Sequence, residues 1–154
     1  MNATGNPSFK MNAMFTHPVR VYWEDTDAGG VVYHAQYLAF LERARTEWLR
    51  DLGYGQELLR REHDLVFAVR AMTIDFRRPA RLDDALTVSV ALRACRGASL
   101  VLAQSIEREG ERLLDAEVRC ASLRAGDFRP RPMPDAMHAR LKALETRAPS
   151  SSTE

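Results

Sequence analysis

Three acidic residues, Glu24, Asp25 and Asp27, fall within four positions of the chain, and Gly29 and Gly30 follow closely. A carboxylate can attack an electrophilic carbon or remove a proton from water. Glycine adopts backbone angles that are closed to other residues, and it lets a ligand approach the main chain. The sequence therefore predicts a carboxylate that is presented at a sharp bend of the backbone.

Residues 31–34 then lead into the predicted start of a long helix. Unpaired backbone N–H groups and the helix dipole favour negative charge at such a start. A carboxylate beside donors that stabilise a developing oxyanion is what acyl transfer requires. An acidic cluster before a helix is also a common turn and capping device, so the pattern alone leaves both interpretations open.

An amphipathic helix over residues 36–52 is predicted to position this segment, and Gly53 is its natural stop. Six apolar residues recur there at steps of three and four and predict one buried stripe: Tyr37, Phe40, Leu41, Ala44, Trp48 and Leu52. The opposite face carries charged residues, among them Arg43 and Glu47 at ion-pair spacing. We expect that face to contact solvent or another subunit.

Alternation of apolar and polar residues predicts five strands, at about 19–25, 65–76, 86–93, 99–107 and 114–120. In the third of these, Leu86, Val88, Val90 and Leu92 are expected to face the core. Short helices are expected at 56–62 and 135–145. Consecutive strands joined by tight turns favour an antiparallel sheet with a helix packed on it, an α+β fold, over a doubly wound α/β fold.

The composition fits one globular domain, since 45% of the 154 residues are hydrophobic and 28% are charged. The net charge of +1 argues against a nucleic-acid partner. We find no apolar run of membrane-spanning length and no signal-like start, so we expect a cytoplasmic protein without membrane insertion. Polar, turn-prone ends predict flexible segments at 1–16 and 147–154 around a single domain at 17–146.

The two cysteines, Cys95 and Cys120, form no metal-binding or CxxC pattern. We expect both to be reduced thiols that pack in apolar surroundings. The sequence thus predicts neither a metal site nor any other cofactor.

Three motifs together resemble the YbgC branch of the 4-hydroxybenzoyl-CoA thioesterase family: EDTDAGGVVYH at 24–34, YLAFLERARTEWL at 37–49 and RPARLDD at 78–84. The resemblance spans about residues 18–134. It implies the hot-dog fold, in which a curved antiparallel sheet of five or six strands wraps a long central helix. It also implies hydrolysis of short-chain or aromatic acyl-CoA thioesters, without cofactor, by homodimers or homotetramers with active sites at the dimer interface. Acyl carrier protein thioesters as further substrates, and an association with the Tol-Pal cell-envelope system, are further expectations.

Carried over by position, the resemblance makes Asp27 the catalytic carboxylate and Asp25 its structural neighbour. Asp27 would either attack the thioester carbonyl, giving a mixed anhydride, or act as a general base toward water. The backbone N–H of His34 would hold the oxyanion, and the His34 side chain is a second catalytic candidate. Gly29, Gly30 and Tyr33 are expected to contact the substrate.

Arg96, in a turn between two predicted strands, is our candidate for the phosphates of CoA, because arginine binds such groups through paired donors. The chain departs from its relatives at Trp23, where many have tyrosine, and at Gln36, where several have asparagine or serine. Glutamine is a poorer N-cap than either, so the geometry at the helix start is open.

Two other functions are compatible with the same fold. A hot-dog dehydratase would need a histidine and an acid that move protons on carbon, and the Asp-x-x-Gly-x-Val pattern at 27–32 argues against it. A non-catalytic acyl-CoA binding or regulatory protein would keep the fold and lose turnover. Release of thiol from acyl-CoA distinguishes these alternatives.

Overall fold

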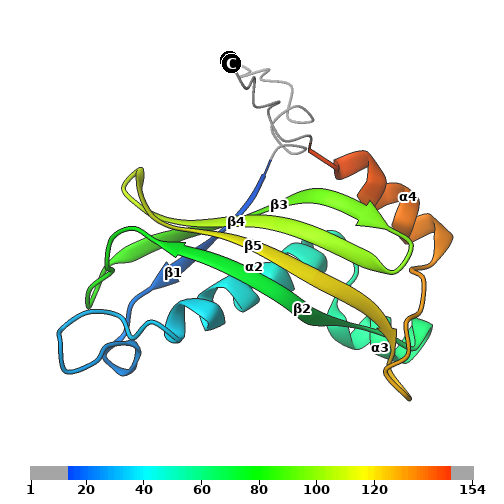
Figure 1. Cartoon of the computed structure of the whole chain (residues 1–154), viewed down its shortest axis with the longest axis horizontal. Coiled ribbons are helices and arrows are strands. Elements are labelled where there is room, and N and C mark those ends of the chain that lie inside the picture. Colours follow the sequence, from blue (N-terminus) through cyan, green and yellow to red (C-terminus); the bar gives the residue numbers. More distant parts are fainter. Residues whose placement is uncertain (1–13, 147–154) are drawn as a thin grey trace, which may run out of the picture.

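The computed structural model of the chain describes residues 14–146. Within these residues, five strands and three α-helices follow one another in the order predicted from the sequence (Figure 1). Their bounds are β1 (Phe15–Arg20), α2 (Gln36–Asp51), α3 (Gln56–His63), β2 (Leu65–Phe76), β3 (Ala85–Arg96), β4 (Ser99–Arg108), β5 (Glu111–Arg124) and α4 (Asp135–Leu144). A short 3₁₀-helix, η1 (Trp23–Asp25), lies between β1 and α2.

All five strands belong to one antiparallel sheet in the order β1-β3-β4-β5-β2, so β1 and β2 are its two edges. The register shifts between Val69 and Ala71 in β2 and between Leu92 and Ala94 in β3. Such irregularities bend a strand and increase its twist. Figure 1 shows the curved sheet wrapped around α2, which confirms the expected α+β hot-dog fold.

The core lies between α2 and the concave face of the sheet. The side chains of Phe40, Leu41 and Ala44 on α2 are fully buried. They face a layer of sheet residues that follows the predicted alternation: Leu86, Val88, Val90 and Leu92 are buried. The helical stripe is confirmed, because Tyr37 and Trp48 are also buried and Leu52 packs half-buried against the core. The expected Arg43–Glu47 pair is replaced by an exposed pair between Glu47 and Arg50.

The first strand was predicted at about 19–25, and this is wrong: β1 ends at Arg20, and residues 23–25 form η1. Val21 still pairs with the residues ahead of β3, since its N–H donates to the carbonyl of Asp84 and its carbonyl accepts from the N–H of Asp83. The backbone leaves the sheet directly afterwards, where the N–H of Asp25 donates to the carbonyl of Tyr22 and closes a tight turn. β1 begins at Phe15, two residues ahead of the domain boundary expected at His17. Residues 1–13 and 147–154, where flexible ends were expected, lie outside the described residues.

Cys95 and Cys120 are free and buried, as expected for packed thiols. Burial raises the pKa of both thiols.

Within residues 14–146, no helix is long and apolar enough to cross a membrane.

Candidate active site

Residues 26–32 form a tight hairpin that carries Asp27, here called the Asp27 hairpin. Thr26 and Val32 pair across its base. The N–H of Asp27 donates to the carbonyl of Val31 at 2.9 Å, and the N–H of Gly30 donates to the carbonyl of Asp27 at 3.0 Å. Gly30 has a φ of 79°, in the left-handed region that glycine occupies without steric cost. The bend predicted from the two glycines is therefore confirmed.

The Asp27 carboxylate is exposed, at the edge of an open hollow of about 570 Å³. Its Oδ1 accepts a hydrogen bond from the N–H of Gly29 at 2.8 Å. No hydrogen bond between described residues uses its Oδ2. Trp23 and Leu82 supply apolar walls to this Asp27 hollow. One carboxylate oxygen is thus oriented by the backbone while the other faces outward with no internal partner.

Asp25, by contrast, is buried and holds the hairpin in place. Its Oδ2 accepts from the N–H of Tyr22 at 2.8 Å, and its Oδ1 accepts from the side-chain amide of Gln36 at 2.8 Å. Its backbone carbonyl accepts from the N–H of Tyr33 at 2.9 Å. Asp25 therefore ties the segments on both sides of the hairpin to the first residue of α2.

The contacts of Gln36 show how the backbone enters α2, which the sequence left undetermined. Helix α2 has no side-chain cap, and its N-cap position is Ala35. The Gln36 side chain is long enough to reach back to Asp25, and it acts there as a donor rather than as a cap. At position 36, the first residue of α2, the glutamine side chain therefore links the helix to the hairpin and does not cap it.

A second anchor comes from the loop that follows β2. The N–H of Val32 donates to the carbonyl of Ala80 at 2.8 Å, and the N–H of Ala80 donates to the Tyr37 hydroxyl at 2.9 Å. Burial raises the pKa of Tyr37. Ala80 is fully buried, so both of its backbone groups need these partners.

The RPARLDD motif is also joined to strand β4 by an ion pair, between Asp84 of the motif and Arg108. Asp84 accepts from the N–H of Arg81 at 2.8 Å and pairs with Arg108 at 2.6 Å. Burial alone would raise the pKa of Asp84, but the Arg81 N–H and the Arg108 guanidinium lower it overall. The motif alone did not predict these roles, because Arg108 and Val32 lie far from Asp84 and Ala80 along the chain.

Tyr33 and His34 lie together at the start of α2, and both side chains are exposed. Their ring centroids are 4.6 Å apart, with the planes tilted by 52°. Among the hydrogen bonds that join described residues, none uses the backbone N–H of His34. This N–H is therefore available to a ligand at the helix start.

Arg96 lies at the opposite end of the sheet. Strand β3 begins at Ala85, next to the anchoring loop, and Arg96 is its last residue. A strand of this length spans roughly 36 Å at about 3.3 Å per residue. In Figure 1 this end of β3 is near α4, away from the start of α2. The structure thus brings Asp27, Gly29 and Gly30 together, joins them to Tyr33 and His34 through Asp25, and leaves Arg96 apart within one chain.

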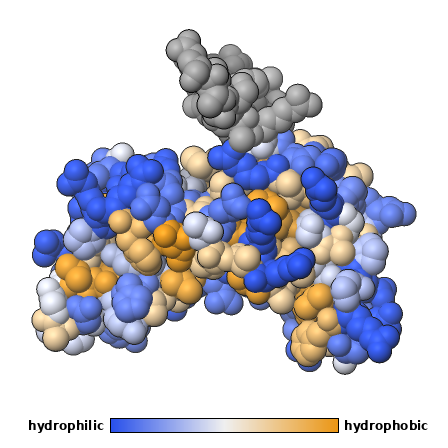
Figure 2. All heavy atoms as spheres, viewed as in Figure 1, coloured by the Kyte–Doolittle hydropathy of each residue, from blue (hydrophilic) through white to orange (hydrophobic). Residues whose placement is uncertain are grey.

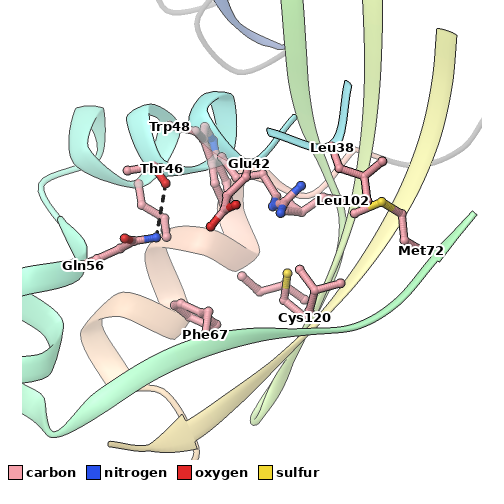
Figure 3. Close-up of a pocket in the computed structure, with 13 residues that line it drawn as sticks. Leu38, Glu42, Thr46, Trp48, Gln56, Phe67, Met72, Leu102 and Cys120 are labelled. Atoms are coloured by element: carbon pink, nitrogen blue, oxygen red, sulfur yellow. Dashed lines mark hydrogen bonds between the residues drawn. The ribbon is translucent and has the colours of Figure 1, made fainter. Parts of the chain in front are cut away.

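A second hollow, of about 290 Å³, lies between α2 and the edge strand β2, and the sequence did not predict it (Figure 3). We call it the α2–β2 hollow. Its apolar walls include Leu38, Trp48, Phe67, Met72, Leu100 and Leu102, and its polar groups are Glu42, Arg45, Thr46 and Gln56. It occupies part of the helix face that was expected to contact solvent or another subunit.

Nowhere in residues 14–146 do three His, Cys, Asp or Glu side chains group so that they could hold a metal ion.

A long helix wrapped by a curved antiparallel sheet defines the hot-dog class of proteins, and this chain has that architecture. Residues 21–141 match the model of the thioesterase-like superfamily. The chain is 47% identical to the acyl-CoA thioester hydrolase YbgC of Escherichia coli O6:H1, over 84% of this chain and 96% of that protein. It is 44% identical to the acyl-CoA thioesterase YbgC of Haemophilus influenzae, over 85% and 96%.

Among solved structures, a probable thioesterase from Bartonella henselae superimposes with a TM-score of 0.76. That structure is 40% identical in sequence, and the match covers 79% of this chain and 100% of the other. The chain therefore belongs to the thioesterase-like superfamily and, within it, to the YbgC family.

The backbone of Gly30 generates a prediction about stability. Replacing Gly30 by alanine places a Cβ where no atom lies within 4 Å, so its cost comes from the left-handed backbone alone. We expect Gly30→Ala to lower the free energy of unfolding by about 1–2 kcal/mol, measured by urea titration. Gly97→Ala is the matched control, because its Cβ also meets nothing and its φ is not left-handed. Equal stability of the two variants would contradict the strained-turn account.

Proposed function

We propose that this chain hydrolyses acyl-CoA thioesters to a free acid and CoA, with Asp27 as the catalytic carboxylate. The observation that carries the proposal is the contrast between two neighbouring aspartates. Asp25 is buried and fully hydrogen-bonded, whereas the exposed Asp27 borders a hollow and is held by a single N–H. The relatives at 44% and 47% identity carry the names of acyl-CoA thioesterases, which supports the same reaction here.

Two routes use the same geometry. In one, Asp27 attacks the thioester carbonyl, the C–S bond breaks to release CoA thiolate, and water cleaves the resulting anhydride. In the other, Asp27 takes a proton from water as the water oxygen attacks the carbonyl carbon, and the C–S bond then breaks to release CoA thiolate and the free acid. In both routes the carbonyl oxygen gains negative charge, and the unused N–H of His34 at the start of α2 is a suitable donor to it.

The acyl group in this proposal is short-chain or aromatic, as the resemblance implies. Gly29, Gly30 and Tyr33 would contact the thioester side of the substrate. The CoA phosphates would need Arg96 of a second chain, because Arg96 and Asp27 lie at opposite ends of one sheet. Tetramer formation, acyl carrier protein substrates and the Tol-Pal association remain predictions from the resemblance.

We further propose a homodimer in which β2 pairs with β2 of a second copy. β2 is an edge strand, and edge strands offer unpaired backbone groups for such pairing. Val69 and Phe76 on β2 are 48% and 50% exposed. In Figure 2, apolar side chains gather along the middle of the face where β2 and α2 lie in Figure 1, with polar side chains around them. This pairing would bring the α2–β2 hollow to the subunit interface.

Removing the charge of Asp27 tests the reaction. Asparagine keeps an Oδ1 that can accept the Gly29 N–H, so the turn should persist while the nucleophile or base is lost. We expect Asp27→Asn to lower the turnover of acyl-CoA at least about a hundredfold, followed by thiol release, with an unchanged melting temperature. Asp51→Asn, an exposed acid at the other end of α2, should keep wild-type activity. Wild-type turnover in Asp27→Asn would refute the assignment.

Gly29 provides a second test, because its substitution moves the carboxylate without straining the backbone. A Cβ on Gly29 would lie 3.1 Å from Oδ1 of Asp27, closer than ordinary contact. We expect Gly29→Ala to lower kcat at least about tenfold, since small misplacements of a reacting group are costly. Its melting temperature should not fall, because alanine restricts the unfolded chain. Unchanged kcat would mean that the orientation of Oδ1 is irrelevant to turnover.

The dimer is tested at the exposed edge. A charge at Val69 would lie close to its own copy across a two-fold axis, and such like-charge contacts are strongly unfavourable. We expect Val69→Asp to raise the dimer dissociation constant at least about a hundredfold, measured by sedimentation equilibrium. Phe128→Asp, at a 68% exposed apolar residue outside the sheet, should leave the constant unchanged. A Val69→Asp protein as dimeric as the wild type would exclude this edge as the interface.

A further inference from the structure

The α2–β2 hollow contains two charged side chains that the proposed reaction does not use, the exposed carboxylate of Glu42 and the partly buried guanidinium of Arg45. We infer that this hollow receives the acyl group and that Arg45 selects acyl groups with a hydrogen-bond-accepting oxygen, such as a hydroxyl or a carbonyl, near their distal end. The inference rests on the proposed thioesterase function and adds a substrate class to it. Arg45 is here a specificity-determining residue, not a catalytic one.

Arg45 is held in a defined position. Its Nη1 donates to Oε1 of Gln104 at 3.0 Å. The Gln104 amide is itself fixed, because its Nε2 donates to the carbonyls of Leu41 at 3.1 Å and Ser89 at 3.3 Å. Gln104 is 3% exposed, so water cannot replace these protein partners. The guanidinium is therefore anchored on its inner side by a neutral amide.

Among the described residues, no ion pair balances the charge of Arg45. Glu42, three residues earlier on α2, lines the same hollow but is exposed. Burial lowers the pKa of the Arg45 guanidinium, which Glu42 and Cys120 only partly offset. A guanidinium has five N–H donors, and a partly buried cation is costly when its donors are unfilled. The remaining donors therefore favour an oxygen supplied by a ligand.

The walls of the hollow fit an apolar group with a polar end. Figure 3 shows Leu38, Leu102 and Met72 on one side, Phe67 and Cys120 below, and Trp48 above. At the other side, the Gln56 amide donates to the Thr46 hydroxyl at 3.2 Å, which joins α3 to α2. An alkyl chain or ring would contact the apolar walls, and its terminal oxygen would meet the guanidinium.

The position of Arg45 along α2 assigns it to the distal part of a substrate. Arg45 is nine residues beyond Gln36, which is about 14 Å of helix axis. The Asp27 hairpin is tied to Gln36 at the start of the same helix. The guanidinium lies nearer the hairpin than the Arg45 backbone, because it contacts Gln104, which in turn contacts the carbonyl of Leu41. Leu41 is five residues beyond Gln36, which is about 8 Å of helix axis. A group that contacts Arg45 is thus separated from the reacting carbonyl by about the length of a short acyl chain.

The test compares substrates that differ by one oxygen. Hexanoyl-CoA and 6-hydroxyhexanoyl-CoA, and the corresponding octanoyl pair, are hydrolysed by the full-length protein, and the ratio of kcat/KM within each pair is measured. We expect the wild type to favour a hydroxylated member, and Arg45→Met to lower that preference at least about tenfold through loss of a charged hydrogen bond. Arg43→Met, an exposed arginine on the same helix, should keep the preference.

A purely structural role for Arg45, including an ion pair with a second copy of the chain, makes a different prediction. Arg45→Met would then lower kcat/KM for both members of each pair equally, or weaken the dimer, and leave the ratio unchanged. Either result would overturn the inference. A wild type that favours the plain acyl chain in both pairs would overturn it as well.

Binding of thioether analogues keeps the inference testable if no thioester is hydrolysed. The chain has two tryptophans, and in Trp23→Phe the remaining one, Trp48, lines the α2–β2 hollow. We expect hexyl-CoA and 6-hydroxyhexyl-CoA thioethers to change Trp48 fluorescence, with the hydroxylated analogue binding more tightly and the difference lost in Arg45→Met. Absent thiol release with this binding pattern would refute the proposed reaction alone. Equal affinities, or no change in Trp48 fluorescence, would refute the inference.

Discussion

Asp25 joins the residues before and after the Asp27 hairpin to the first turn of α2, and its backbone carbonyl accepts the N–H of Tyr33. One carboxylate oxygen accepts the backbone N–H of Tyr22 and the other accepts the Gln36 amide. Hydrogen bonds to a charged group contribute about 1.5–3 kcal/mol each, and a buried carboxylate without them would be very costly. Breaking these hydrogen bonds would leave the buried Asp25 carboxylate without donors, so they fix the hairpin to the helix. The long helix in turn is fixed by its apolar stripe under the sheet.

The two aspartates illustrate how environment divides structural and chemical roles. They are two residues apart, yet one is enclosed by donors and the other meets solvent with a single N–H. A reactive carboxylate must stay accessible, so it depends on its neighbours for position. The site in one chain is correspondingly open, because the Asp27 hollow is widely exposed to solvent. Strand β2 is an edge of the sheet with an unpaired backbone. In the proposed dimer, a second copy would cover the α2–β2 hollow, where Arg45 would meet the distal end of the acyl group.

Local periodicity explains why most of the fold was predictable. The helical spacing of Tyr37, Phe40 and Trp48 and the alternation in β3 are read within single elements, and both correspond to buried faces. The first strand was misplaced because its extent depends on pairing with β3, about 70 residues later in the chain, and on the turn that begins at Tyr22. The roles of Ala80, Asp84 and Arg45 could not be predicted either, because their partners belong to other elements that are distant in sequence. Arg96 was chosen by residue type and turn position, neither of which reports on which end of the sheet a turn occupies.

A structure of the Asp27→Asn protein with a bound acyl-CoA would test the central claim most directly, namely that the Asp25-anchored hairpin presents the reacting carboxylate at the start of α2. The account predicts that the thioester carbon lies beside residue 27, with its carbonyl oxygen within hydrogen-bond distance of the His34 backbone N–H. A thioester group bound away from both residues would contradict it.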